Sequence, residues 1–391
     1  MSSRFRLTLV LGALSAFAPM SIDMYLPSLP TLAREFDADT ASTQLTLSAF
    51  FLGLAIGQAL YGPLADRYGR KPPLYLGLSL YVLASAGCAL ATSIEGLIVW
   101  RFIQAFGGCA GVVIARAVVR DLFDESASAR MLSRMMLVMG AAPMLAPLLG
   151  GWMLGAWGWR AIFWALVGFG AVCTVATLFA LRETRPRTTV RLGAGSALRG
   201  YARLLGERRF VGYTLAGGFA QAGMFAYISG SPFVFIEVYG VPAASYGWLF
   251  GLNALGLIAA SQINARLIGT LGPDRLLARA NLANALFGAA LAATAATGFG
   301  GFAGILIPLF GYVASLGFSF PNAAAGAMAP YPEQAGSASA LLGTVQFAIA
   351  AVAGAAVGWT HDGTALPMAL VIAVCGASAL TAQRLLVRRN W

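Results

Sequence analysis

Two charged side chains stand inside long apolar stretches of this 391-residue sequence. Asp23 lies within residues 7–27, and Arg101 lies within residues 95–117. A charge inside a membrane costs about 2.5–3.5 kcal/mol, so it marks a candidate functional site. Apolar surroundings favour the protonated form of a carboxyl, whereas a neighbouring Arg or a cationic ligand favours the ionised form. We therefore expect Asp23 to load and release a proton, with Arg101 setting the balance.

The composition places both charges in a membrane protein. Hydrophobic residues make up 59% of the chain and charged residues 10%, whereas a soluble domain carries about 25% charged residues. Such a chain cannot cover a soluble surface, and its hydrophobicity excludes disorder. The four cysteines show no metal-binding spacing, and the single histidine, His361, has no partner in its short loop. We expect no metal and no cofactor.

Apolar runs long enough to cross a bilayer, which takes about 20 residues, occur twelve times. Their approximate ranges are 7–27, 43–62, 73–92, 95–117, 131–156, 160–181, 209–232, 243–266, 275–297, 301–322, 336–358 and 364–385. Continuous runs indicate helices rather than the alternating strands of outer-membrane barrels. The first run is too long for a cleavable signal peptide. We predict an all-α integral membrane protein with twelve transmembrane helices.

The basic residues predict the orientation of these helices. If the N-terminus is cytoplasmic, every Lys and Arg falls inside except Arg34 and Arg160, which lie outside, and Arg101, which lies within a span. This bias follows the positive-inside rule. It also accounts for the net charge of +11 without any nucleic acid. We therefore expect a multi-pass protein with both termini in the cytoplasm.

The same orientation places Asp23 and Arg101 at similar depths. Asp23 lies about 24 Å along its span, and Arg101 lies about 9 Å from the outer face, at 1.5 Å per residue. Both therefore fall in the outer third of a core about 30 Å thick, where they could share one polar cavity. Gln104 follows Arg101 on the same helix face. Two alternatives stay open: Arg101 reaches the outer headgroups, or the first span ends just before Asp23.

The longest polar stretch separates the first six spans from the last six. It contains the sequence RETRPRTTVRLGAGS, and eight arginines occur within residues 182–209. We predict an N-terminal six-helix bundle over residues 1–181, a basic cytoplasmic linker over 182–208 and a C-terminal six-helix bundle over 209–391. The basic face of the linker is expected to lie against anionic lipid headgroups.

A short charged loop joins the second and third spans. It reads GPLADRYGRK, from Gly62 to Lys71. Asp66 can pair with Arg70 or with bases on neighbouring helices, which would hold helix ends together in one conformation and release them in another. The other interpretation of the loop is a positive-inside signal that happens to contain one acid.

This loop resembles the signature of the major facilitator superfamily, G-x-L-a-D-r-x-G-r-[KR], with every position filled. In the second half of the chain, residues 265–275 read ARLIGTLGPDR. Aligning Gly69 with Gly272 gives an offset of 203 residues, at which Asp66 meets Gly269. The second copy of the loop is therefore degenerate.

Two more segments resemble motifs of the superfamily. RFIQAFGGCAG, residues 101–111, matches the pattern of a membrane-embedded Arg followed by Gln and glycines. Arg120 and Asp121 resemble the charged helix end that joins the Asp66 network in relatives. APLLGG, residues 146–151, resembles the antiporter motif G-P-x-x-G-G through Pro147, Gly150 and Gly151, although Ala146 stands where Gly is usual.

The first span resembles that of one subgroup. APMSIDMYLPSLP, residues 18–30, is similar to the bicyclomycin/chloramphenicol resistance group of drug:proton antiporters (Bcr/CflA type), and so are residues 44–58, 115–123 and 229–235. The resemblance implies two pseudo-symmetric six-helix bundles around a midplane cavity. It also implies proton-coupled efflux of small hydrophobic drugs by alternating access across the bacterial inner membrane, by a monomer without a cofactor.

Candidate substrate-binding residues lie near the two charges and near the position that the offset relates to Asp23, which is Ala226. No carboxylate occurs inside the spans of the second half, and the bases within their ranges lie near the span ends: Arg209, Arg266, Arg275, Arg279 and Arg384. Aromatic side chains with a few amides suit a permissive apolar pocket. The candidates are Met20, Tyr25, Gln104, Gln221, Phe225, Tyr227 and Asn253. Ordinary helix packing is the alternative for each of them.

Two other function classes, a dedicated metabolite transporter and a membrane enzyme, are alternatives to drug efflux, and a channel is a third class with its own sequence requirement. An exporter or importer of one metabolite, such as the amino acid cysteine, would show narrow and stereospecific flux. A membrane enzyme would need His, Asp or Cys clustered at one depth, and the sequence has no such cluster. A channel would need a charged ring or a repeated filter segment. The expected partners are therefore drug-like molecules, protons and the lipid bilayer.

Overall fold

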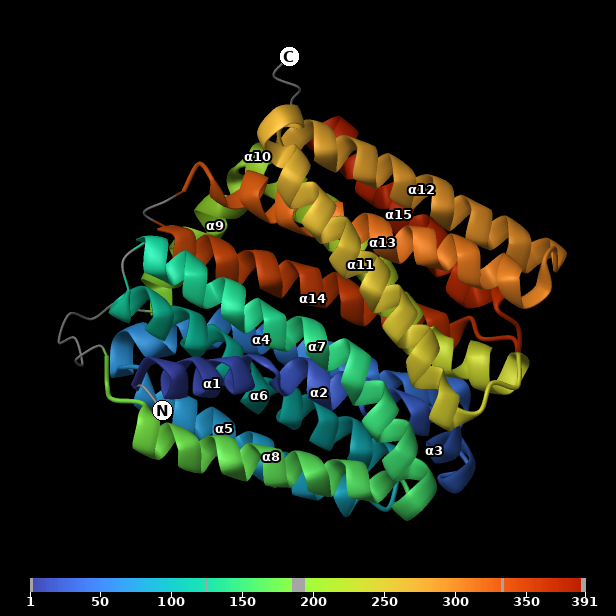
Figure 1. Cartoon of the computed structure of the whole chain (residues 1–391), viewed down its shortest axis with the longest axis horizontal. Coiled ribbons are helices and arrows are strands. Elements are labelled where there is room, and N and C mark those ends of the chain that lie inside the picture. The colour runs from blue at the N-terminus through green and yellow to red at the C-terminus, as the bar shows by residue number, and fades with distance from the viewer. Residues whose placement is uncertain (1–2, 124, 185–193, 332–333, 388–391) are drawn as a thin grey trace.

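The computed structural model describes residues 3–123, 125–184, 194–331 and 334–387. Within its helices, the side chains of residues 3–5, 194–198 and 335 and most of those in 125–141 lie outside the description. The described chain is helical, with turns and short loops between the helices. Its helices form two stacked groups, one from each half of the sequence (Figure 1).

The first group contains the helices up to residue 180, and the second group follows a short connecting helix. The first comprises α1 (Ser3–Ser15), α2 (Phe17–Asp23), the 3-10 turn η1 (Leu26–Ser28), α3 (Leu29–Glu35), α4 (Thr40–Tyr68), α5 (Lys71–Ala89), α6 (Ile94–Leu122), α7 (Glu125–Trp157) and α8 (Trp159–Ala180). The connecting helix is α9 (Ala194–Gly206). The second comprises α10 (Arg208–Pro232), the π-helical turn η2 (Phe233–Val238), α11 (Ala243–Leu271), α12 (Pro273–Thr297), α13 (Gly301–Met328), α14 (Ala335–Trp359) and α15 (Leu366–Leu386).

The number of long apolar helices confirms an all-α membrane protein. Among the described residues, 10 helices are long and apolar enough to cross a membrane, and the bent series from α1 to α3 makes an eleventh span. The 33-residue α7, whose side chains are described only in part, covers the remaining predicted run, residues 131–156. Several helices extend beyond the predicted apolar runs because their polar ends continue the helix past the hydrocarbon core.

The offset of 203 residues reappears in the helix boundaries. α4 and α11 each contain 29 residues and start at Thr40 and Ala243, which are 203 positions apart. Gly69 follows α4 at φ 87°, and Gly272 follows α11 at φ 75°. Only glycine adopts this backbone region at little cost. The two glycines therefore make equivalent turns into α5 and α12.

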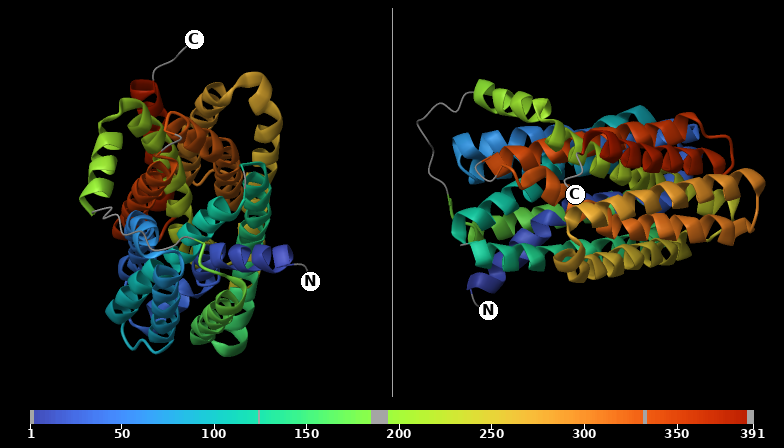
Figure 2. Two further views of the ribbon diagram at one scale, coloured as in Figure 1. Left: turned by 90° about the vertical axis from the view of Figure 1, so that its left-hand side faces the viewer. Right: turned by 90° about the horizontal axis from the view of Figure 1, so that it is seen from above.

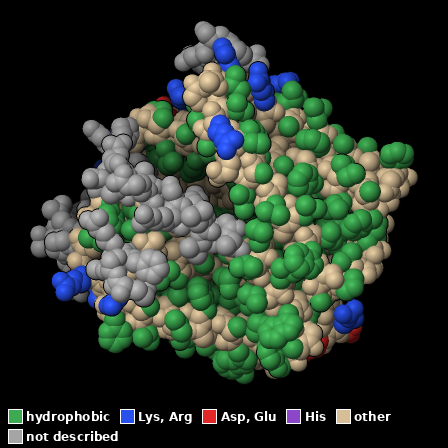
Figure 3. Space-filling view, viewed as in Figure 1, with side chains coloured by type: hydrophobic (Ala, Val, Ile, Leu, Met, Phe, Trp, Pro, Cys, Tyr) green, Lys and Arg blue, Asp and Glu red, His purple; other side chains and the backbone are tan. Residues whose placement is uncertain are grey.

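The two groups of helices meet along two pairs, α4 with α14 and α7 with α11. The end of the bundle at which Arg70 joins α4 to α5 is called the basic end below, and the end at which Asp39 caps α4 is called the opposite end. At the opposite end, Gly151 of α7 lies against Ala243 of α11. Figure 3 shows a hollow in the surface toward the basic end. The structure is therefore closed at the opposite end.

The predicted linker of residues 182–208 is partly helical. Residues 185–193 lie outside the described residues, but α9 occupies most of the remainder. Leu204 of α9 is buried among side chains of the second half. Figure 2 shows α9 on the flank of the bundle. The sequence pattern of the linker, which is basic, does not predict this helix, because α9 buries only a few apolar residues.

The described basic residues are distributed between the two ends as the sequence predicts. Arg160 lies at the opposite end, where its Nη1 is 2.5 Å from Oε1 of Glu35. Arg34 is in the last turn of α3 at the same end. The predicted cytoplasmic bases that lie outside the described side chains are Arg4, Arg130, Arg134, Arg185, Arg187, Arg191, Arg388 and Arg389.

Candidate substrate and proton site

Asp23 is the last residue of α2, at a break in the first span. Pro27 has no N–H to donate to the carbonyl of Asp23, and its ring crowds that carbonyl, so a regular helix cannot continue. The N–H of Tyr25 bonds to the carbonyl of Ile22 (3.2 Å) instead of reaching back to Ser21. The break therefore leaves the Ser21 carbonyl available to another donor.

Asp23 is buried without a partner. Its side chain is 4% exposed, and among the described residues it makes no hydrogen bond and no ion pair. Its carboxyl lies within electrostatic range of the hydroxyls of Tyr227 in α10 and Tyr246 in α11. A carboxyl of the first half therefore lies close enough to the second half for its charge to act on these two hydroxyls. The contact region between the two halves, along α4 with α14 and α7 with α11, is called the seam.

Arg101 binds the Ser21 carbonyl, which the helix break leaves without its helical donor. Its Nη1 donates to the Ser21 carbonyl (3.0 Å) and to Oε1 of Gln104 (2.7 Å). The guanidinium carbon lies 4.4 Å from the ring centre of Tyr25 and 4.3 Å from that of Phe50. Arg101 therefore contacts the chain on both sides of Asp23. Its Nε and Nη2 are buried without hydrogen-bond partners.

A closed ring of polar contacts fixes Arg101. Gln104 Nε2 donates to Oγ of Ser85 (2.8 Å), and Oγ of Ser85 donates to the carbonyl of Tyr81 (2.7 Å). The Tyr81 hydroxyl lies 2.7 Å from Oγ of Ser21. The ring joins α2, α5 and α6. The ring satisfies Nη1 of Arg101 and joins three helices around it, while Nε and Nη2 of the same guanidinium lie against aromatic rings without a hydrogen-bond partner among the described residues.

The structure does not bring Asp23 and Arg101 into one ion pair. The aromatic rings that Arg101 contacts are those of Tyr25, Phe50 and Phe163, all in the first half. Arg101 is 0% exposed, so its side chain does not reach the outer headgroups. Burial of Asp23 likewise places it inside the protein rather than at a helix end in water. Arg101 thus acts on the backbone that carries Asp23.

The second half presents an aromatic and amide surface to Asp23. Nδ2 of Asn253 donates to the Tyr227 hydroxyl (3.1 Å). The rings of Tyr227 and Phe250 stack, with centres 5.6 Å apart and 19° between planes. The hydroxyl of Tyr246 lies 2.6 Å from Oγ of Ser231. Two predicted substrate-binding residues, Tyr227 and Asn253, therefore belong to one cluster.

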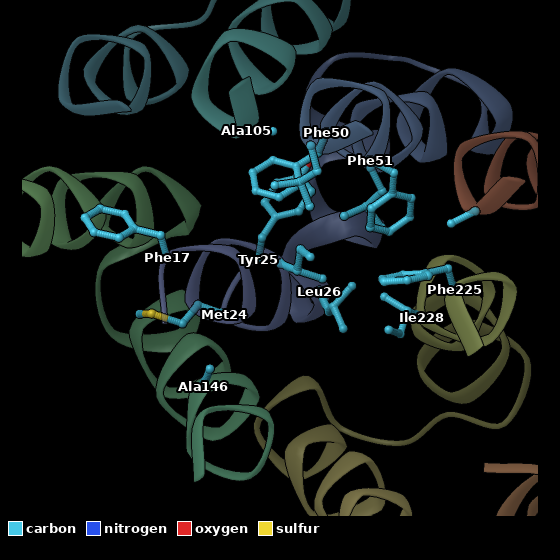
Figure 4. Packing of buried hydrophobic residues seen from close by; sticks show 14 of the residues in the cluster. Phe17, Met24, Tyr25, Leu26, Phe50, Phe51, Ala105, Ala146, Phe225 and Ile228 are labelled. Atoms are coloured by element: carbon cyan, nitrogen blue, oxygen red, sulfur yellow. The ribbon is translucent and has the colours of Figure 1, made fainter. Parts of the chain in front are cut away.

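Phe225 crosses the seam between the halves. Its ring centre lies 4.4 Å from that of Phe51 in α4 and 5.6 Å from that of Phe347 in α14. Figure 4 shows Leu26 of η1 beside Phe225 and Ile228 of α10. These contacts make the seam apolar beside η1, which follows Asp23 in the chain.

The remaining predicted binding residues lie in different surroundings. Tyr25 belongs to the first half, where its hydroxyl lies 2.8 Å from Oγ1 of Thr46. Gln104 belongs to the Arg101 ring. Met20 is half-buried against the apolar core, and Gln221 is half-buried in α10. The predicted binding residues are thus divided between the first and the second half of the protein.

The signature loop forms a charge network at the basic end. Arg70 donates from Nη1 to Asp66 (2.8 Å), and from Nε and Nη2 to the two oxygens of Asp121 (2.7 and 3.0 Å). Burial lowers the pKa of Arg70, but the bonds from Asp121 and Asp66 outweigh this effect and raise it. Arg120 is exposed, with its guanidinium beside Gly336 of α14.

Glu183 completes this network from the start of the linker. Its two oxygens accept the backbone N–H groups of Arg70 (2.8 Å) and Lys71 (3.0 Å). A carboxylate at a helix N-terminus is favourable because the free N–H groups there carry partial positive charge. Gly62, by contrast, has no neighbour within 4 Å of the position of a Cβ.

The antiporter motif in α7 places glycines at two close contacts. The carbonyl of Met24 occupies the space that a Cβ at Gly150 would need. A Cβ at Gly151 would come within 2.7 Å of the Ala243 carbonyl. Pro147 is buried one turn earlier. The two glycines therefore bring α7 against the break beside Asp23 and against the second half.

Several site residues were missed at the level of sequence. Tyr81 and Ser85 are four residues apart in an apolar span, and this spacing puts two polar groups on one helix face. Glu183 and Tyr246 carry no comparable signal, because their partners come from distant parts of the chain. Asp274, in the degenerate second loop, accepts a bond from the Tyr213 hydroxyl (2.5 Å).

Comparison with known proteins agrees with this geometry. The family model described as Major Facilitator Superfamily matches residues 11–355. The chain is 36% identical over 374 residues to the "Uncharacterized MFS-type transporter YdgK" of Bacillus subtilis, covering 95% of this chain and 92% of that one. It is 32% identical over 389 residues to the "Bicyclomycin resistance protein homolog" of Haemophilus influenzae, covering 99% and 98%. "Multidrug resistance protein MdtL" of Klebsiella pneumoniae is 30% identical over 85% of this chain and 83% of its own.

Solved structures share the fold. A D-xylose-proton symporter superposes with a TM-score of 0.76 at 16% identity, covering 99% of this chain and 98% of the symporter. The partially occluded inward-open form of the Escherichia coli xylose transporter XylE superposes with a TM-score of 0.78 at 15% identity, covering 100% and 99%. These relatives and structures are transporters rather than enzymes. The chain therefore belongs to the major facilitator superfamily of membrane transporters.

Proposed function

We propose that this protein exports small, mostly hydrophobic, drug-like molecules in exchange for protons across a bacterial inner membrane. The observation that carries the proposal is Asp23, a buried carboxyl at a helix break that has no hydrogen-bond or ion-pair partner among the described residues. The names of two relatives, a bicyclomycin resistance homologue and a multidrug resistance protein, support drug-like cargo.

The position of Asp23 suits proton exchange. An ionised carboxylate in an apolar seam is costly unless water or a cation reaches it, whereas the protonated form is not. Closing the seam over Asp23 therefore favours the proton, and opening it toward a cavity favours release. The broken helix lets the carboxyl face a seam that changes as the halves rock.

The surroundings of Asp23 suit a varied cargo. Phe51, Phe225 and Phe250 offer flat apolar surfaces, while Asn253 and Tyr227 supply polar contacts. Apolar walls with a few polar groups are typical of small-molecule sites. A molecule in this region would lie beside Asp23, so its binding and the proton would compete.

The proton gradient supplies enough energy for this cycle. One pH unit provides about 1.4 kcal/mol per proton, and 100 mV provides about 2.3 kcal/mol per charge. Together they support export against a gradient of several hundredfold for one proton. No cofactor is needed for such a cycle, and since one chain contains both halves, we propose that it works as a monomer.

Proton release on binding tests the proposal. Purified protein in unbuffered detergent solution with a pH dye is challenged with chloramphenicol-like drugs, sulfonamides, lipophilic cations and cysteine. We expect a drug to release protons from the wild type and not from Asp23→Asn. Asp39→Asn is the matched control, because Asp39 is exposed and Asn also caps a helix well.

The other outcomes separate the alternatives. Release that persists in Asp23→Asn would assign the proton to another group. Release by cysteine alone would favour a dedicated metabolite transporter. No release by any compound would contradict antiport, and flux measured in liposomes would then show whether the protein takes up its cargo.

A further inference from the structure

One backbone carbonyl in α4 lacks the N–H donor that a regular helix would provide. Pro63 lies inside α4. In a regular helix the carbonyl of Ala59 accepts the N–H of residue 63, but proline has no N–H to donate. A carbonyl without its helical partner favours a donor from another element. The helix that carries the signature loop therefore offers an acceptor to whatever packs beside it.

Tyr201 of α9 supplies that donor. Its hydroxyl donates to the Ala59 carbonyl at 3.1 Å. Tyr201 also lies close enough to Asp66 of the signature loop to interact with its charge. Burial and the charge of Asp66 raise the pKa of Tyr201, so the hydroxyl keeps its proton at physiological pH. It therefore remains a hydrogen-bond donor.

α9 itself is attached to the second half. Leu204 is 1% exposed and packs in a cluster with Phe210 and Leu342. Tyr201 packs at the edge of the same cluster. α9 contacts both α10 and α14. The bond from Tyr201 to Ala59 thus joins a helix that moves with the second half to a helix of the first half.

A second bond of the same kind lies one turn away. Oγ1 of Thr344 in α14 lies 3.1 Å from the carbonyl of Ala55 in α4 and 2.9 Å from the carbonyl of Ala340 in its own helix, so its one proton is shared between them. Ala55 and Ala59 are four residues apart, so their carbonyls lie on one face of α4. The hydroxyls of Tyr201 and Thr344 therefore contact consecutive turns of α4 toward its basic end.

We propose that Tyr201 is a positioning residue that holds the basic ends of α4 and the second half together through the Ala59 carbonyl freed by Pro63. The bond stabilises the arrangement seen here and breaks when the halves separate along α4 and α14. This inference rests on the proposed function only in assuming that transport requires the halves to rock. The linker helix α9 then stabilises one arrangement of the two halves in addition to connecting them.

Distance measurement between spin labels tests the inference without any substrate. Leu122 and Ile268 lie near the basic ends of α6 and α11 and are 47% and 36% exposed. Cysteines at these two positions can be labelled selectively, because the four native cysteines are buried. Pulsed electron paramagnetic resonance then gives the populations with a short and a long separation.

Tyr201→Phe removes only the hydroxyl. Because the bond stabilises the arrangement described above, we expect the population with the label separation of that arrangement to fall about 2- to 10-fold relative to the other population, the range of a net hydrogen bond. Tyr239→Phe is the matched control, because the Tyr239 hydroxyl also donates to a carbonyl (Gly301, 3.4 Å), but within the second half. Populations that match the wild type in Tyr201→Phe would overturn the proposal.

A double-mutant cycle tests whether Tyr201 acts through Ala59. Pro63→Ala restores an N–H that can bond to the Ala59 carbonyl within α4. We expect Tyr201→Phe to shift the populations less in this background than in the wild type. Equal shifts in both backgrounds would place the action of Tyr201 elsewhere and overturn the mechanism. Because no drug or proton is involved, failure of antiport in the dye assay leaves this result interpretable.

Discussion

The carbonyl of Met24 fills the space beside Gly150 that any larger residue would need. Met24 follows Asp23 at the helix break, and Gly150 belongs to the antiporter motif of α7. The motif therefore has a direct structural consequence at the proposed proton site. It allows α7 to cover the backbone at the break, which a Cβ at position 150 would prevent.

Gly150→Ala is expected to displace the break and impair transport. Overpacking of this kind costs about 1–3 kcal/mol, which we expect to appear as a lower melting temperature in detergent. Drug-driven proton release is expected to fall about tenfold or more. Gly155→Ala, in the same helix with no atom within 4 Å of its Cβ position, is the control. Equal behaviour of the two variants would contradict the role of Gly150.

The sequence predicts the repeat of the fold well, because the repeat depends on local signals. Gly69 and Gly272 occupy turns that require positive φ, and the offset they define also relates the starts of α4 and α11. Apolar runs likewise locate the spans, since crossing a bilayer fixes their length. The sequence does not predict α9, because the few apolar residues of this helix become buried only when the second half folds.

Arg101 is expected to depend on the shape of its guanidinium as well as on its charge. Arg101→Lys keeps a positive charge but cannot bond to the Ser21 carbonyl and Gln104 while stacking on two rings. We expect proton release to fall about tenfold or more. Wild-type release in Arg101→Lys would mean that charge alone suffices.

A neutral variant separates stability from transport at the same position. Arg101→Met removes a buried charge that has no carboxylate partner among the described residues. Since an uncompensated buried charge is costly, we expect Arg101→Met to melt no lower than Arg101→Lys while remaining inactive. A much lower melting temperature for Arg101→Met would show that the cation itself stabilises the fold.

Arg70 is expected to stabilise the basic end through its forked bonds to Asp121. Lysine has one ammonium group and cannot reproduce this geometry. Arg70→Lys should lower the free energy of unfolding by about 1–3 kcal/mol, the worth of a charged hydrogen bond. Chemical unfolding followed by tryptophan fluorescence measures it. Arg67→Lys, an exposed base in the same loop, is the control, and equal losses in both variants would refute the assignment.

The candidate site was predicted only in part, for a physical reason. Asp23 and Arg101 are identifiable because charges are rare in apolar spans. The contact between Arg101 and the backbone beside Asp23 cannot be predicted from the sequence. It depends on the Ser21 carbonyl, which loses its helical donor only in the folded chain. Ser21, Tyr81 and Ser85 complete the Arg101 ring through contacts between separate helices. Polar residues of this kind look ordinary in sequence.

Phe225 is expected to contribute to affinity for aromatic cargo. Its ring packs against Phe51 across the seam and against Phe347 within the second half, and an aromatic pair contributes about 0.5–1.5 kcal/mol beyond its buried area. In Phe225→Leu, the KM for aromatic drugs should rise about 2- to 10-fold, measured by flux in proteoliposomes. The KM for a cargo without rings should change less. Phe299→Leu, an exposed ring outside the seam, controls for loss of a phenyl group. An equal change in KM for both kinds of cargo would assign Phe225 to closure of the seam rather than to binding.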